Sequence, residues 1–176
     1  MRIWASAPRG RRNAKVPEGR PNPAHRGSGG ERSYSQIYVH LVFSTKDRRN
    51  SIPKEWQARV WSYLGGICRN HEIPVQAIGG TENHVHLLIL LPPKLSLAKA
   101  VALLKANSSK WMGEQGHRFS WQEGYGAFSV SSSNLDRVIR YIQNQETHHR
   151  KTKFEDEFQG LLRKHGVEYD PEWVFG

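Results

Sequence analysis

A short strand that carries two histidines constrains the fold of this chain more than any other feature. The turn at residues 79–83 and the pair Pro92-Pro93 bound the segment His84–Leu91, which is apolar except for His84 and His86. In a strand, residues two apart point to the same face. We therefore expect both imidazoles to project from one face, with Cα atoms about 6 to 7 Å apart, while the alternating apolar residues face a core.

The remaining strands and helices follow from the spacing of apolar residues. Alternation of apolar and polar residues predicts strands over residues 37–44, 75–78 and 127–130. Helical spacing predicts helices over residues 54–71, from the capping residue Ser96 to about Trp111, and from Ser133 or Asn134 to about Arg150. A short amphipathic segment over residues 154–165 closes the chain.

The order of these elements predicts an α+β fold. The predicted order is strand, helix, strand, strand, helix, strand, helix. This order is typical of the ferredoxin-like, RRM-like domain, in which two helices cover one face of an antiparallel sheet. The other face is open for a ligand, as in RNA-recognition domains. The last predicted helix has to dock on that open face if its side chains are to reach His84 and His86.

Charge divides the chain into two parts. The formal net charge is +10, which favours nucleic acid as a partner over an anionic membrane. Residues 1–33 hold eight of the basic side chains and only two acidic ones, with several prolines and glycines and no apolar periodicity. We predict a disordered basic N-terminal extension over 1–33 and a folded domain over 34–176. The extension is either an arm that holds DNA or a mis-assigned start without function, and we favour the second reading.

Several classes of protein are excluded by what the sequence lacks. No apolar run approaches the roughly 18 residues of a membrane-spanning helix, and the first residues contain no apolar signal core. Cys68 is the only cysteine, which excludes an internal disulfide and a cysteine-rich zinc site. A cytoplasmic location without a membrane partner is expected.

The paired histidines predict a metal site that needs further ligands. Two imidazoles on one sheet face can bind one divalent ion together, although a surface strand can also carry them without a metal. Tyr141 and Gln145 stand four residues apart, which puts them on one face of the last predicted helix. Taken alone, Tyr141 reads as a half-buried packing residue and Gln145 as a solvated one.

Other histidines fit less specific roles. His40 is expected on the strand next to the paired histidines and on the same face, where it could support a metal ligand or contact a phosphate. An exposed strand histidine outside the metal shell is the commoner case. His148 and His149 follow Gln145 by one turn, and we expect them to be solvated rather than bound to DNA.

At these residues the sequence resembles a known family. The triplet His84-Val85-His86 and the run Tyr141-Ile142-Gln143-Asn144-Gln145 resemble motifs of the single-tyrosine HUH transposases of insertion sequence 200-like elements and of their relatives associated with repetitive extragenic palindromes. Residues 38–46 and 121–130 resemble the same family. The resemblance covers about residues 34–176, whereas residues 1–33 match nothing in it.

The resemblance implies a reaction and a set of site residues. By analogy, His84, His86 and Gln145 bind Mg²⁺ or Mn²⁺, and Tyr141 on the catalytic C-terminal helix attacks a DNA phosphodiester. The attack leaves a 5′-phosphotyrosine link and a free 3′-OH. The implied substrate is single-stranded DNA with hairpin ends, used in DNA transposition. Members are usually homodimers with shared active sites, while the palindrome-associated relatives can be monomers.

Basic and aromatic side chains outside these motifs are candidates for contact with DNA. The basic candidates and one histidine are His40, Lys46, Arg48, Lys105, Lys110, Arg140, Arg150 and Lys151. Each could equally be a solvated surface residue. Trp121 and Tyr125 could stack on unpaired bases, although core packing is at least as favoured for Trp121.

Three alternatives stay open at this point. A non-catalytic ferredoxin-like nucleic-acid-binding protein would use aromatic residues on its open sheet face, where this chain has histidines. A replication initiator or relaxase would share the histidine pair but needs a longer chain. A domesticated palindrome-associated transposase would keep the same motifs.

Overall fold

The computed structural model describes residues 34–170 and residue 174 of the chain. The predicted disorder of residues 1–33 therefore lies outside the described residues. Among the helices that are described, none combines the length and the apolar character needed to cross a membrane.

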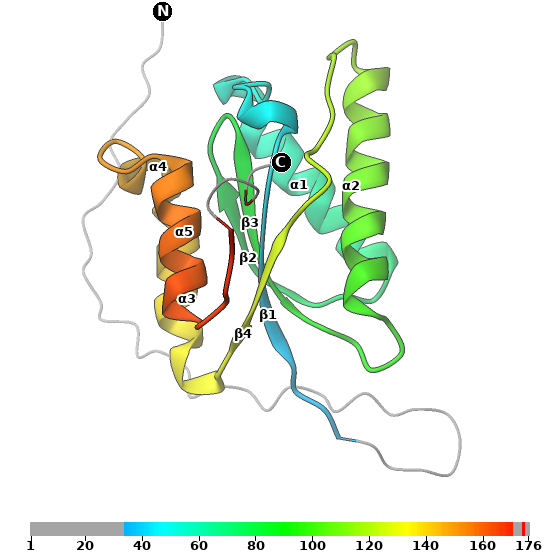
Figure 1. The fold of residues 1–176 in the computed structure, drawn as a ribbon. Helices are drawn as coiled ribbons and strands as arrows, with labels where there is room; N and C mark the ends of the chain where they lie inside the picture. Colours follow the sequence, from blue (N-terminus) through cyan, green and yellow to red (C-terminus); the bar gives the residue numbers. More distant parts are fainter. Residues whose placement is uncertain (1–33, 171–173, 175–176) are drawn as a thin grey trace, which may run out of the picture. The chain divides into compact units, whose positions relative to one another are not determined.

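Four strands form one antiparallel sheet with the order β2-β3-β1-β4 (Figure 1). Their bounds are β1 Tyr38–Ser44, β2 Val75–Gly80, β3 His84–Leu90 and β4 Gly126–Val130. The predicted strands are confirmed, and β2 runs two residues further than expected. Its last two residues are glycines that still pair with β3, because Gly79 lies opposite His86 and Gly80 opposite Val85.

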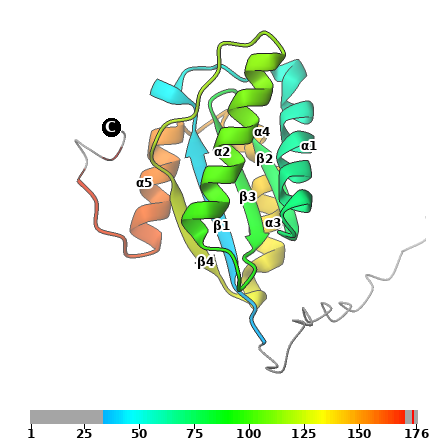
Figure 2. The ribbon, with the colours of Figure 1, turned by 90° about the vertical axis from the view of Figure 1, so that its right-hand side faces the viewer.

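Two long helices cover one face of the sheet, as predicted (Figure 2). They are α1 Lys54–Asn70 and α2 Leu97–Glu114, and α2 begins after Ser96, whose hydroxyl accepts a hydrogen bond from the Lys99 backbone N–H. The residues that alternate with the histidines of β3 belong to the main core with both helices, as Val85, Leu87 and Ile89 are fully buried there. The prediction that the residues alternating with the two histidines face the core is thus confirmed.

The second face of the sheet is covered by the C-terminal helices (Figure 1). These are α3 Leu135–Gln143, α4 Gln145–His148 and α5 Phe154–Lys164. Ile142 of α3 packs with Leu88 and Ala77 of the sheet, while a separate cluster joins α5 to β1 and β4. The predicted docking of the last helix is confirmed, but the face is less open than expected because α5 covers part of it.

The predicted single helix to about Arg150 is wrong in one respect. It ends at Gln143, and the short helix α4 starts anew at Gln145. Between them Asn144 has φ −101° and ψ 18°, and its side-chain amide donates to the Arg140 carbonyl. The Asn144 backbone N–H also donates to two carbonyls, to Arg140 at 3.1 Å and to Tyr141 at 3.3 Å, so the last turn of α3 tightens toward a 3-10 turn and the helix ends here. Short 3-10 turns, Lys46–Arg48 and Ser132–Asn134, complete the described elements.

Candidate active site

The pairing of β3 between β1 and β2 places its two histidines in the interior of the molecule. His86 lies opposite Val42 of β1 and Gly79 of β2, in the middle of the sheet. Both imidazoles are completely buried, and their ring centroids are 5.0 Å apart. The prediction that they share a face is confirmed, and that face is the one covered by the C-terminal helices.

Two residues that follow Tyr141 in the chain join this pair. Ligand atoms of His84, His86, His149 and Glu157 all lie within 4.8 Å of one another, and we call these four residues the histidine–glutamate cluster. The Oε2 atom of Glu157 is 2.9 Å from Nε2 of His149, 3.4 Å from that of His86 and 3.7 Å from that of His84. The Phe154 ring, at the start of α5, stacks on the His84 ring at 4.6 Å and helps to place Glu157.

Each histidine of the cluster is oriented by a bond from its outer nitrogen. Nδ1 of His84 is 2.7 Å from Oδ1 of Asn83, and Nδ1 of His149 is 2.8 Å from the Thr152 carbonyl oxygen. Nδ1 of His86 shares a 2.9 Å hydrogen bond with Nε2 of His40. An oxygen or nitrogen partner at Nδ1 fixes the ring and turns Nε2 toward the cluster, which is the usual arrangement of metal-binding histidines.

His40 is therefore neither an exposed strand residue nor a surface contact for phosphate. It is only 3% exposed, and its ring stacks on His86 with centroids 5.1 Å apart. Burial, and next the neighbouring His86, hold the pKa of His40 well below its usual range, so the ring is neutral. Of the roles considered from the sequence, support of a metal ligand is the one that fits this position.

The protonation states of His84 and Glu157 are those that a divalent cation requires. Burial lowers the pKa of His84, and the adjacent His86 lowers it further. Burial opposes the charge of Glu157, but the contacts with His149 and His86 outweigh it and hold the carboxyl pKa well below its usual range. A neutral imidazole at His84 beside a carboxylate at Glu157 is suitable for binding a metal ion. Nε2 of His86 also has no hydrogen-bond partner within the described residues, which suits a nitrogen that binds a metal.

Tyr141 and Gln145 lie beside this cluster, from the two sides of the break at Asn144. The Tyr141 hydroxyl donates a hydrogen bond to Oε1 of Glu157, and its ring centroid is 5.8 Å from that of His86. Burial, followed by the charge of Glu157, raises the pKa of Tyr141 above its usual value. The Gln145 amide nitrogen donates to Oε1 of Glu157 at 2.9 Å, and its Oε1 is 3.2 Å from Nε2 of His84. The four residues singled out from the sequence are thus brought together within one chain.

The remaining DNA-contact candidates differ in how accessible they are. Lys46, Arg140, Arg150 and Lys151 are exposed. Arg48 forms an ion pair with Glu155 of α5 at 3.0 Å, and Lys110 faces Glu114 within α2 at 3.9 Å. Lys105 donates to the backbone carbonyls of residues 122–124 at 2.7 to 2.9 Å, which occupies all three of its N–H donors. Its position argues for a role in holding that loop.

The two aromatic candidates for base stacking also differ in how exposed they are. Trp121 is 7% exposed, packs edge-on against Phe43, and donates from Nε1 to the Ser108 hydroxyl at 2.8 Å. Core packing is thus confirmed for Trp121, and stacking on bases is wrong because its ring is enclosed. Tyr125 is 40% exposed and remains a candidate for stacking.

Sequence reasoning missed Glu157 and placed His149 wrongly in solvent. His149 was expected to be solvated, yet its side chain is only 12% exposed, and Glu157 is 2% exposed. One signal was available for Glu157. It lies three residues after Phe154 and four before Leu161, so it shares the apolar face of α5, where an unpartnered carboxylate is costly.

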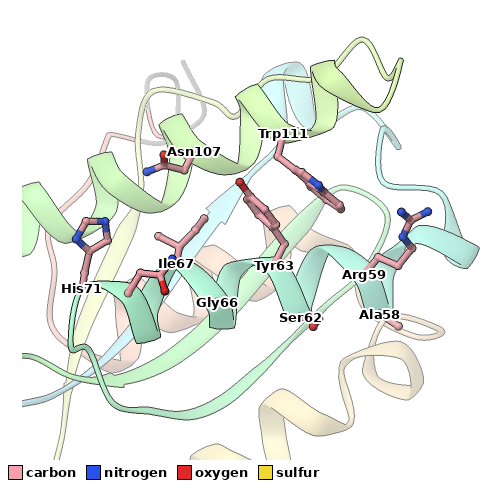
Figure 3. Close-up of a pocket in the computed structure, with 10 residues that line it drawn as sticks. Ala58, Arg59, Ser62, Tyr63, Gly66, Ile67, His71, Asn107 and Trp111 are labelled. Carbon is pink, nitrogen blue, oxygen red and sulfur yellow. The ribbon is translucent and has the colours of Figure 1, made fainter.

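A groove of about 610 Å³ lies away from this cluster, between α1 and α2 (Figure 3). The rings of Tyr63 and Trp111 stack across it with centroids 4.4 Å apart. Its walls also contain Arg59, Asn107 and His71. Because these helices cover the other face of the sheet, the groove is separate from the histidine–glutamate cluster.

Comparison with known proteins gives a consistent result. The family model described as "Transposase IS200 like" matches residues 33–145 of the chain. Transposases for insertion sequence element IS200 from Salmonella typhimurium and Salmonella typhi are each 29% identical over 114 residues. That alignment spans 60% of this chain and 74% of each relative.

Two solved structures share the fold. A putative transposase from Deinococcus radiodurans has a TM-score of 0.53 at 22% identity, over 68% of this chain and 98% of its own. A REP-associated tyrosine transposase bound to a REP hairpin also has a TM-score of 0.53, at 13% identity, over 84% of this chain and 92% of its own. At these identities the likeness is one of fold, and it confirms the α+β architecture.

Proposed function

Because the chain belongs to the IS200-like transposase family, whose members cleave and rejoin DNA, we propose that Tyr141 is the nucleophile that cuts the DNA strand. The observation that carries the proposal is the position of the Tyr141 hydroxyl. It is hydrogen-bonded to Glu157, whose other carboxylate oxygen faces His84 and His86. A tyrosine that only packed against the sheet would not need a buried carboxylate as its partner.

The proposed reaction exchanges one phosphodiester for another. The Tyr141 oxygen bonds to phosphorus, the bond from phosphorus to the 3′ oxygen breaks, and the products are a 5′-phosphotyrosine and a free 3′-OH. A phenol with a pKa of about 10 is a poor nucleophile when protonated. Oε1 of Glu157 accepts the hydrogen bond from this phenol and fixes the position of its oxygen; the phenol loses its proton to solvent as it attacks, and the leaving 3′ oxygen takes up one proton from water. The covalent link conserves the bond, so the reverse reaction rejoins DNA without ATP.

The residues present fit a divalent metal, for which the family resemblance implies Mg²⁺ or Mn²⁺. The imidazoles of His84 and His86 would hold it. The third ligand that the family resemblance implies, the amide oxygen of Gln145, lies 3.2 Å from Nε2 of His84. A metal there would supply Lewis-acid stabilisation of the phosphate oxygens. The chain's own contribution is to fix these two imidazoles through Asn83 and His40.

We extend the proposal to single-stranded hairpin DNA as the substrate. The net charge of +10 favours a phosphate backbone, and the exposed Lys46, Arg140, Arg150 and Lys151 offer contacts to it. The solved relative bound to a REP hairpin supports the same class of ligand. An open sheet face for base stacking, which a non-catalytic binding module would need, does not fit the face covered by α3 and α5.

Loss of a single hydroxyl tests the nucleophile. The wild-type protein, incubated with Mn²⁺ and single-stranded hairpins from its own flanking genomic DNA, is expected to form a denaturant-resistant protein–DNA adduct. Tyr141→Phe should form none but should still bind the hairpin, since binding rests on charge and shape. Tyr63→Phe, in the groove between α1 and α2, is the matched control and should behave as wild type. An adduct that persists in Tyr141→Phe would show that another residue attacks.

A further inference from the structure

We propose that the metal of this transposase is held by His84, His86, His149 and Glu157, and that this set selects a transition-metal ion over Mg²⁺. The inference rests on the proposed function and deepens it. Two of these ligands, His149 and Glu157, lie beyond residues 33–145, the part of the chain that matches the family model. They come from the segment that follows the tyrosine helix, so this site is a feature of the chain's own C-terminal part.

The distances from Glu157 to the three histidines are close to those between ligands of one ion. Donors bound about 2.1 Å from a metal in tetrahedral geometry lie about 3.4 Å from one another. The separations from Oε2 of Glu157 to Nε2 of His86 and of His84 are 3.4 and 3.7 Å. The separation to Nε2 of His149 is 2.9 Å, the length of a hydrogen bond, and needs to widen by only a few tenths of an ångström.

The hydrogen-bond partners of the imidazoles leave the inner nitrogens for a cation. The Thr152 carbonyl oxygen can only accept, so Nδ1 of His149 carries a hydrogen and its Nε2 holds a lone pair in the neutral ring. Asn83 acts on His84 in the same way through Oδ1. Lone pairs aimed at a carboxylate repel it unless a second proton or a cation lies between them. Nε2 of His86, fully buried, lacks a hydrogen-bond partner within the described residues and points to the same place.

Glu157 takes the ligand position nearest to the two sheet histidines, and Gln145 supports it. The Gln145 amide nitrogen donates to Oε1 of Glu157, so the amide holds the carboxylate whose other oxygen faces the imidazoles. A carboxylate also contributes a negative charge that an amide oxygen lacks. We therefore assign Gln145 the role of a positioning residue and Glu157 that of the ligand.

The composition of this set decides which ion it prefers. Three imidazole nitrogens and one carboxylate oxygen suit Mn²⁺, Co²⁺ or Zn²⁺, and affinity rises toward Zn²⁺ in this order. Mg²⁺ prefers oxygen ligands in an octahedral arrangement and retains its water molecules. Three of the four ligands are buried and His149 is only 12% exposed, which disfavours an ion that keeps its hydration shell.

Metal titration of the full chain without DNA tests the ligand set. Calorimetry with Mn²⁺, Zn²⁺ and Mg²⁺ in turn should give one Mn²⁺ or Zn²⁺ per chain, with Mg²⁺ at least about tenfold weaker. His149→Ala and Glu157→Gln should each weaken Mn²⁺ binding by about 100-fold, and Gln145→Ala, which removes a supporting group, by about tenfold. His71→Ala, which removes an exposed histidine at the end of α1, is the matched control and should bind Mn²⁺ as wild type does.

A second measurement covers the case in which a variant fails to fold. The visible spectrum of bound Co²⁺ reports its ligands, so His149→Ala should change that spectrum while His71→Ala leaves it unchanged. Glu157→Asp keeps the charge and should retain the fold with weakened binding.

If His149→Ala and Glu157→Gln bind Mn²⁺ as tightly as wild type while His84→Ala does not, the proposed ligand set is wrong, whereas the assignment of Tyr141 as nucleophile is unaffected. If Mn²⁺ binds as expected but no adduct forms on any hairpin, the proposed function fails instead.

Discussion

Burial changes the chemistry of single side chains in this protein, and Cys68 gives a simple test of it. The thiol is fully enclosed on α1, and burial raises its pKa to about 11. Because only the thiolate reacts, we expect the native protein at pH 8 to react with Ellman's reagent about 100-fold more slowly than in urea. Cys68 is the only cysteine, so the absorbance change reports this one residue. Rapid reaction of the native protein would contradict the burial.

The same dependence on burial explains which site residues the sequence could reveal. His84 and His86 could be predicted because a spacing of two places them on one strand face, whatever the rest of the fold. Glu157 could not be predicted in the same way, since it stands among Glu155 and Asp156 in the first turn of α5. Acidic residues are common there because they stabilise the positive end of the helix. Only the contact of α5 with the sheet shows that one of the three is buried.

At the scale of elements, the approach of α3 to β2 determines where Tyr141 lies. A Cβ atom on Gly79 would be 2.2 Å from the backbone oxygen of Ile142, the residue next to Tyr141. We expect Gly79→Ala to force the helix away from the strand and to destabilise the protein by about 2 to 3 kcal/mol. Urea unfolding followed by circular dichroism measures the loss, and adduct formation should fall in the same variant.

A second glycine provides the control for this substitution. A Cβ atom on Gly66, inside α1, meets no other atom within 4 Å. Gly66→Ala should therefore leave the stability unchanged or raise it by about 0.5 to 1 kcal/mol, because alanine favours the helix. Equal stability of Gly79→Ala and wild type would show that the helix and strand are not in close contact.

Element prediction from the sequence succeeded where local periodicity was sufficient. The strands and the helices α1 and α2 alternate or repeat clearly, and each was expected in its place. The break at Asn144 was missed because residues 145–150 contain no proline or glycine, and the tightening of the last turn at Asn144 leaves no signal in the sequence. The second helix layer was only partly expected, since the sequence predicted α5 as an amphipathic segment without saying which surface it covers.

At the scale of the whole molecule, one chain contains every group of the proposed site. The sheet supplies His84 and His86, α3 supplies Tyr141, and the segment after Asn144 supplies Gln145, His149 and Glu157. The family resemblance left open whether the tyrosine serves its own chain or a partner's. The Tyr141 ring lies 5.8 Å from the His86 ring of the same chain, which favours a site within one chain even if the protein forms dimers.

Mixing two inactive variants tests this arrangement. Tyr141→Phe keeps the metal site without the nucleophile, and His86→Ala keeps the nucleophile with an impaired metal site. We expect the two, co-expressed so that chains can exchange, to form no more denaturant-resistant adduct with labelled hairpin DNA than either alone, because neither chain holds a complete site. Wild type co-expressed with Tyr141→Phe is the control and should form adduct in proportion to its wild-type content. Recovery of adduct in the mixture of variants would mean that Tyr141 of one chain acts at the histidines of another, and that α3 exchanges between subunits in the active protein.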